Sequence, residues 1–154
     1  MRVRQFSTLL AVALSVACSD NSPTAVSIEQ TAFAPALDVN LAQSIKAPSG
    51  LYYRDITPGT GAVLANGQRV GMRYVGSFTN GAEFDSNAPP QPLFSFTLGS
   101  GEVIKGWDLG LVGMKVGGRR QLIIPPSLGY GRDGRGPIPG NSVLVFVVDA
   151  VSAQ

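Results

Sequence analysis

Glycine and proline are the residues that most limit what this chain can fold into. The sequence holds 19 Gly and 11 Pro, and most of the Gly falls after residue 58, between β-branched and aromatic runs. Long helices form poorly around such residues, because Gly costs about 1 kcal/mol and Pro about 3 kcal/mol relative to Ala in a helix interior. The distribution therefore predicts a turn-rich β or α+β domain.

Runs of alternating or continuous apolar residues between these turns predict the strands. About five are expected, over 51–56, 69–79, 93–98, 119–124 and 142–151. The last run is nearly all apolar, so we expect it to be central in the sheet and buried on both faces.

One short helix is predicted over 104–114. Ile104, Trp107, Leu111 and Met114 recur at helical spacing and form an apolar stripe. Because three glycines weaken this segment, it must depend on packing against other elements. Together these patterns predict an α+β domain over 49–154, an antiparallel β-sheet of about five strands wrapped around one short α-helix.

Residues 1–18 have the pattern of a signal peptide. Arg2 and Arg4 precede an apolar run that is shorter than the roughly 20 residues that span a bilayer. The only cysteine, Cys18, ends the run in a sequence that resembles a bacterial lipobox, which implies lipidation of Cys18. We therefore expect an exported protein of the cell envelope, lipid-anchored to a membrane. The alternatives are an ordinary secretory signal with an incidental cysteine, and a short buried helix.

Residues 19–48 are predicted to form a flexible tether. They are rich in Ser, Thr, Ala, Pro, Asn and Gln, and their apolar residues keep neither helical nor strand spacing for long. A short helix or docking segment over 37–45 is the alternative.

The charge and the missing residue types exclude several functions. The formal charge is +2, but Arg2 and Arg4 belong to the leader, and removing these two from the 12 basic residues leaves ten, equal to the 10 acidic ones. No basic run remains, so nucleic-acid binding is not expected. The sequence has no His and 1 Cys, which excludes His-based acid–base chemistry, His metal ligands and an internal disulfide. No metal or cofactor is predicted.

Large aromatic residues are more numerous than the pattern can place. We expect Phe96 to be core, whereas the others are either core or the lining of an apolar pocket for a small ligand or side chain. The residues in question are Tyr74, Phe84, Phe94, Trp107, Tyr130 and Phe146.

Several motifs in register then resemble one family over residues 50–152. They are VGMRYVG at 70–76, GAEFDS at 81–86, FSFTLG at 94–99, EVIKGWDLGL at 102–111, MKVGG at 114–118, LGYG at 128–131, IP at 138–139 and LVF at 144–146. In this order they are similar to the FKBP family of peptidyl-prolyl cis-trans isomerases. The resemblance implies that fold, acceleration of X–Pro bond rotation in proline-containing polypeptides, and inhibition by macrolides of the rapamycin type. A monomer is expected.

The resemblance also implies a role for individual residues. Trp107 would be the floor for the proline ring, and Asp85 would lie at the rim. The Ile104 backbone N–H and the Tyr130 hydroxyl would bind substrate carbonyls. The walls and remaining contacts would come from Tyr74, Phe84, Phe94, Val103, Ile138 and Phe146.

Two loops depart from the family pattern. Residues 87–92 replace a charged loop that often supplies an Arg to the pocket Asp, so we expect Asp85 to be oriented by Tyr74 or by water. The loop at 132–137 is shorter and charged, which should alter the preferred peptides. A non-catalytic module that grips proline-containing segments, and a structural lipoprotein without pocket function, remain alternatives.

Overall fold

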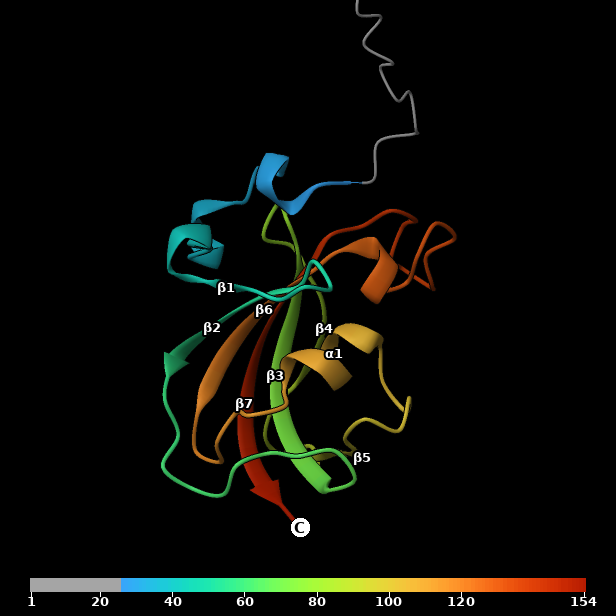
Figure 1. Ribbon diagram of the computed structural model, residues 1–154. Helices are drawn as coiled ribbons and strands as arrows, with labels where there is room; N and C mark the ends of the chain where they lie inside the picture. The colour runs from blue at the N-terminus through green and yellow to red at the C-terminus, as the bar shows by residue number, and fades with distance from the viewer. Residues whose placement is uncertain (1–25) are drawn as a thin grey trace, which may run out of the picture.

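The computed structural model describes residues 26–154 (Figure 1). The predicted signal peptide with Cys18 and the first part of the predicted tether, 19–25, lie outside the described residues. Within residues 26–154 there is no helix with the length and apolar character needed to cross a membrane.

The described chain forms one antiparallel sheet and one short α-helix, which confirms the predicted α+β class. The strands are β1 (Ile45–Lys46), β2 (Tyr52–Thr57), β3 (Arg69–Phe78), β4 (Glu83–Asn87), β5 (Phe94–Thr97), β6 (Arg119–Ile124) and β7 (Leu144–Ala153). They are ordered β1-β2-β6-β7-β3-β4, and β5 pairs with β3. The sheet thus has seven strands instead of about five, because β1 and β4 are too short or too polar to give a period-2 signal.

The last strand, β7, lies between β6 and β3, as its apolar sequence predicted. Its alternate residues face two separate cores. Leu144, Phe146 and Val148 belong to the core on the side of the helix. Val145 belongs to a second core on the opposite face of the sheet.

The second core exists because the segment expected as a flexible tether is packed from residue 26 onward. Three 3-10 turns, at Ile28–Gln30, Pro35–Leu37 and Leu41–Gln43, run along the sheet on the side away from the helix (Figure 1). Ile28 is 2% exposed and packs with Tyr52 and Val145. A sheet with two apolar faces needs a covering layer on each, and this segment supplies the second one.

Polar contacts also hold this segment to the sheet. The Gln121 amide donates a 2.7 Å hydrogen bond to the Leu37 carbonyl. Lys46 and the Tyr52 hydroxyl both donate to the Glu29 carboxylate. The Lys46 ammonium, with further hydrogen bonds, holds the pKa of Glu29 well below its usual range. The packed unit therefore begins well before the predicted boundary at residue 49.

The helix α1 spans Lys105–Gly110 and is shorter than the predicted 104–114. It ends before Gly113, whose φ of +80° lies in the left-handed region. Two of its glycines allow it to approach the sheet closely. A Cβ on Gly106 would lie 2.6 Å from Ile124, and one on Gly110 would lie 2.8 Å from Leu122. The glycines that weaken the helix are therefore the residues that let it pack.

Arg120 ties the end of this helix to the sheet. Its guanidinium binds the Asp55 carboxylate through two hydrogen bonds of 2.6 and 3.0 Å and donates a third, of 2.8 Å, to the Gly110 carbonyl. The side chain is buried below the ring of Tyr53, 4.7 Å from the ring centroid. A cation that bonds the last carbonyls of a helix is favourable, because those carbonyls carry partial negative charge.

Candidate active site

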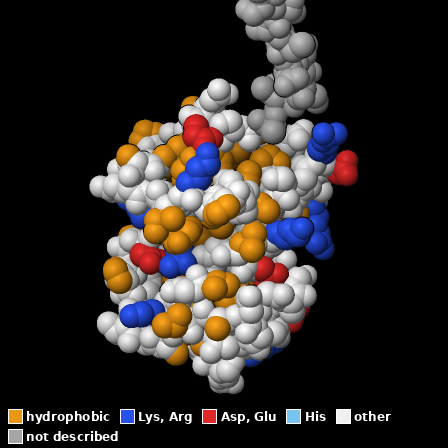
Figure 2. All heavy atoms as spheres, in the orientation of Figure 1, with side chains coloured by type: hydrophobic (Ala, Val, Ile, Leu, Met, Phe, Trp, Pro, Cys, Tyr) orange, Lys and Arg blue, Asp and Glu red, His pale blue; other side chains and the backbone are white. Residues whose placement is uncertain are grey.

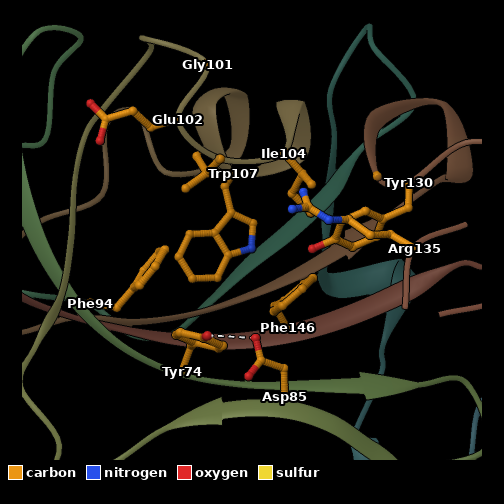
Figure 3. A pocket seen from close by; sticks show the side chains of 12 residues that line it. Tyr74, Asp85, Phe94, Gly101, Glu102, Ile104, Trp107, Tyr130, Arg135 and Phe146 are labelled. Carbon is orange, nitrogen blue, oxygen red and sulfur yellow. Dashed lines mark hydrogen bonds between the residues drawn. The ribbon is translucent and has the colours of Figure 1, made fainter. Parts of the chain in front are cut away.

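A pocket of about 400 Å³ opens between α1 and the sheet (Figure 3). It is lined by Tyr74, Asp85, Phe94, Gly101, Glu102, Val103, Ile104, Trp107, Gly129, Tyr130, Arg135 and Phe146. The side chains come from β3, β4, β5, α1, β7 and the loops that join them, so the site depends on the whole fold.

Trp107 forms the centre of the aromatic lining. Its indole meets the rings of Tyr74, Phe94 and Phe146 edge-on, at centroid distances of 5.1, 5.8 and 5.4 Å and interplanar angles of 87, 89 and 90°. Edge-to-face contacts of this kind are the favoured geometry for aromatic pairs. They leave one apolar space enclosed by several rings (Figure 3). Phe96 lies behind this lining at 1% exposure, which confirms it as core.

Gly76 on β3 leaves space for the rings of Phe146 and Phe84. It pairs with Phe146 on one side and with Asp85 on the other. A Cβ at this position would lie 2.7 Å from the ring of Phe146 and 2.8 Å from that of Phe84. Any larger residue here would displace an aromatic ring at the pocket wall.

Asp85 is held at the rim by Tyr74. The Tyr74 hydroxyl donates a 2.8 Å hydrogen bond to Asp85 Oδ2, which is one of the two arrangements expected for this carboxylate. Burial, reinforced by the hydrogen bond to Asp85, raises the pKa of Tyr74 well above its usual value. The hydroxyl therefore stays protonated and remains a donor at neutral pH. Arg73 instead holds the loop that follows, donating to Asn87 Oδ1 at 2.6 Å.

Two donors at the pocket, the Ile104 N–H and the Tyr130 hydroxyl, have no protein acceptor in residues 26–154. The Ile104 backbone N–H precedes the first turn of α1 and makes no hydrogen bond there. The Tyr130 hydroxyl is also free, and burial raises its pKa, so it too stays protonated. The indole Nε1 of Trp107 is buried and unpaired. A ligand that brings carbonyl oxygens would accept hydrogen bonds from the Ile104 N–H and the Tyr130 hydroxyl.

The loop before α1 is held by the helix itself. The Asp108 carboxylate accepts hydrogen bonds from the N–H groups of Gly99 and Gly101, at 2.8 and 3.0 Å. This places Val103 and Ile104 at the pocket edge, next to Trp107.

The structure brings eight of the ten predicted site residues into this one pocket. Phe84 and Ile138 line an adjoining cavity of about 350 Å³ that shares Asp85, Tyr130 and Arg135 with the first. Sequence reasoning did not name Gly101, Glu102, Gly129 and Arg135 as site residues. Of these, only Arg135 could have been suspected from the sequence, because it lies in the charged loop at 132–137 that departs from the family pattern.

The lining combines aromatic rings with a few polar groups at the rim. The sequence has no His, and the part of the chain that the structure describes holds no group of three His, Cys, Asp or Glu that could bind a metal ion. An apolar ring and flanking carbonyls are what the lining fits best. An antiparallel sheet curled around one short helix, with an aromatic pocket between them, is the class of domain that the fold and the site define.

The chain belongs to the family of FKBP-type peptidyl-prolyl cis-trans isomerases, whose model matches residues 61–151. It is 58% identical over 110 residues to FK506-binding protein 4 of Rhizopus delemar, covering 71% of this chain and 28% of that protein. It is 48% identical over 109 residues to FK506-binding protein 4 of Dictyostelium discoideum, covering 70% and 29%. The chain thus spans under a third of the length of these relatives.

A solved structure gives the same fold. The crystal structure of AtFKBP13 superposes with a TM-score of 0.68 at 38% identity, covering 72% of this chain and 98% of that one. The predicted family and the predicted fold, an antiparallel sheet with one short helix, are both confirmed.

The predicted location is corrected by the relatives. Sequence analysis placed the protein at the cell envelope as an exported, lipid-anchored protein, but the fungal and Dictyostelium relatives are named FK506-binding protein 4 and not as exported lipoproteins. That prediction is therefore wrong. It depended on a short apolar run and one cysteine, Cys18, and a pattern of that length carries little specificity.

Proposed function

We propose that this chain accelerates cis–trans isomerisation of X–Pro bonds in proline-containing polypeptides, acting as a monomer. The observation that carries the proposal is the set of edge-on rings around Trp107 beside free hydrogen-bond donors at the rim.

The proposed mechanism begins with the barrier of the uncatalysed reaction. Rotation about an X–Pro bond costs about 18–20 kcal/mol because amide resonance is lost as the bond twists. The twisted amide has a less polar carbonyl and is less strongly hydrated than the planar form. A dry aromatic pocket therefore favours the twisted amide over the planar one, which is differential binding of the transition state.

The rim groups would orient the substrate during this rotation. The proline ring would lie over Trp107, and the Ile104 N–H and the Tyr130 hydroxyl would bind backbone carbonyls on the two sides of the rotating bond. Asp85, held by Tyr74, would stabilise the altered charge of the twisted amide. No covalent intermediate and no proton transfer are required, which is consistent with a chain that has no His.

A macrolide of the rapamycin type would compete for the same pocket, as family membership implies. The proposal is tested by refolding a protein whose slow phase is limited by an X–Pro bond, which takes tens to hundreds of seconds without a catalyst. The full chain should shorten that phase in proportion to its concentration, and the macrolide should abolish the effect. If the macrolide binds but the slow phase keeps its rate, the chain is a proline-gripping module and not an isomerase.

A further inference from the structure

Arg135 contributes a positive charge to the pocket. It lines both the aromatic pocket and the adjoining cavity, and its guanidinium points toward the space beside Ile104 and Tyr130 (Figure 3). Among residues 26–154 it forms no salt bridge. Burial raises the pKa of the Tyr130 phenol and the charge of Arg135 opposes that rise, which agrees with their closeness.

The backbone fixes where this side chain begins. The Arg135 N–H donates to the Ile138 carbonyl at 2.9 Å, and the Ile138 N–H donates back to Arg135 at 3.0 Å. Gly134 and Gly136 flank it with φ of +71° and +55°. A Cβ on Gly134 would lie 2.2 Å from the Ile138 carbonyl oxygen, so the turn requires glycine there. Arg135 is thus presented by a closed turn at the pocket mouth.

Two carboxylates share the pocket with Arg135, and neither forms a salt bridge with it. Asp85 accepts the hydroxyl hydrogen bond of Tyr74. Glu102 forms a 3.4 Å salt bridge with Arg69, on the side of the pocket that leads to β3. The guanidinium of Arg135 therefore faces the ligand space as the cation available to an incoming acid.

We propose that Arg135 is a specificity-determining residue that favours substrates with an acidic side chain next to the proline. The proposal rests on the isomerase function proposed above. Arg binds carboxylates through paired N–H donors, and Arg135 is exposed, so the effect is that of a solvent-exposed ion pair. The expected preference for Glu over its neutral isostere Gln is about two- to fivefold in kcat/KM.

The test compares isosteric peptides on the full chain. Isomerisation is measured for Glu-Pro and Gln-Pro peptides, for Leu-Pro-Glu and Leu-Pro-Gln peptides, and for a Leu-Pro reference without charge. We expect a Glu/Gln ratio above two on at least one side of the proline, falling toward one in the Arg135→Gln variant and below one in Arg135→Glu. The ratio should also fall as salt is raised, because exposed charges are screened.

Arg132→Gln is the matched control. Arg132 lies in the same loop and is exposed, but it lines neither cavity, so its loss should leave the Glu/Gln ratio intact. A ratio near one on both sides of the proline, or an equal loss of preference in the two variants, overturns the proposal. If the Leu-Pro reference itself is not accelerated, the isomerase function has failed, and that result is separate from a failure of the preference.

Discussion

The Tyr74 hydroxyl and the Asp85 carboxylate are joined by a 2.8 Å hydrogen bond across neighbouring strands, at the mouth of the aromatic pocket. One residue is both a wall of the apolar space and the group that orients the rim carboxylate. Tyr74 also meets the Trp107 ring edge-on at 5.1 Å. The apolar and the polar halves of the site are therefore coupled through a single side chain.

Removing only the Tyr74 hydroxyl should separate its role as a pocket wall from its role as the donor to Asp85. Tyr74→Phe keeps the ring but frees Asp85, and we expect kcat/KM for a Leu-Pro peptide to fall about three- to tenfold, which corresponds to the loss of one hydrogen bond. Tyr53→Phe is the control, because Tyr53 packs on Arg120 outside the pocket. An unchanged rate in Tyr74→Phe would mean that the orientation of Asp85 does not matter.

Activity and stability should depend on pH in different ways. With no His in the chain and both pocket tyrosines protonated, kcat/KM should vary by less than about twofold between pH 6 and 9. Stability should behave differently, because the pKa values of Tyr74 and Tyr130 are raised in the folded state, chiefly by burial. An unfolded Tyr loses its proton near pH 10, so the unfolded chain binds fewer protons above that pH.

Proton linkage predicts that the folded state loses stability at high pH. The stability that these tyrosines contribute is fully present below pH 10 and is lost as the pH rises toward their folded pKa values. Urea midpoints measured from pH 8 to 11.5 should therefore fall above pH 10, and should fall less in Tyr74→Phe. Equal losses in the variant and the parent would show that Tyr74 is not responsible.

The pocket floor can be tested against a neighbouring core ring. Trp107→Leu removes the ring on which the substrate proline would lie, and one aromatic contact contributes about 0.5–1.5 kcal/mol, so kcat/KM should fall about two- to tenfold. Phe96→Leu is the matched variant, since Phe96 is buried against the Trp107 ring but does not line the pocket. If Trp107 is the pocket floor, the two variants should have similar urea midpoints, and only Trp107→Leu should lose activity. An equal loss of activity would point to general loosening of the core.

The N-terminal segment should contribute to stability although it is far from the pocket. Ile28 is 2% exposed in the second core, so Ile28→Ala should destabilise the full chain by about 2–4 kcal/mol. Val26→Ala is the control, because Val26 is 42% exposed, and its effect should stay within about 0.5 kcal/mol. If urea unfolding gives the same midpoint for both variants, the segment does not pack on the sheet in solution.

The sheet was largely predictable because its strands carry a strong period. β7 alternates between two cores, and its continuous apolar sequence correctly indicated a central strand. The helix was predicted too long because the apolar stripe continues through Leu111 and Met114. Both residues are buried, but Met114 reaches the core from beyond the left-handed turn at Gly113 and not from a helix.

The N-terminal layer and the position of the Arg135 side chain at the pocket could not be predicted from pattern, although the charged loop at 132–137 was singled out. Ile28, Leu37 and Leu41 are brought to the sheet by irregular 3-10 turns, so their spacing shows no period. Arg135 reaches the pocket only because a turn built on Gly134 closes against Ile138. In each case, contacts between segments that are distant in the sequence determine where the side chain lies. Such contacts cannot be predicted from the local sequence.

Charged side chains are dispersed on the face of the molecule shown in Figure 2. Figure 2 shows basic and acidic side chains scattered among apolar ones on the face in view, without a basic patch over the described residues there.

The central claim is that the pocket around Trp107 lowers the barrier to X–Pro rotation. Exchange between the cis and trans forms of a Leu-Pro peptide, measured by NMR at equilibrium with the full chain, tests it most directly. The account predicts an exchange rate that rises in proportion to protein concentration, leaves the cis-to-trans ratio unchanged and returns to the uncatalysed value when a rapamycin-type macrolide fills the pocket. An exchange rate that stays at the uncatalysed value with the folded chain, while the macrolide still binds, would contradict it.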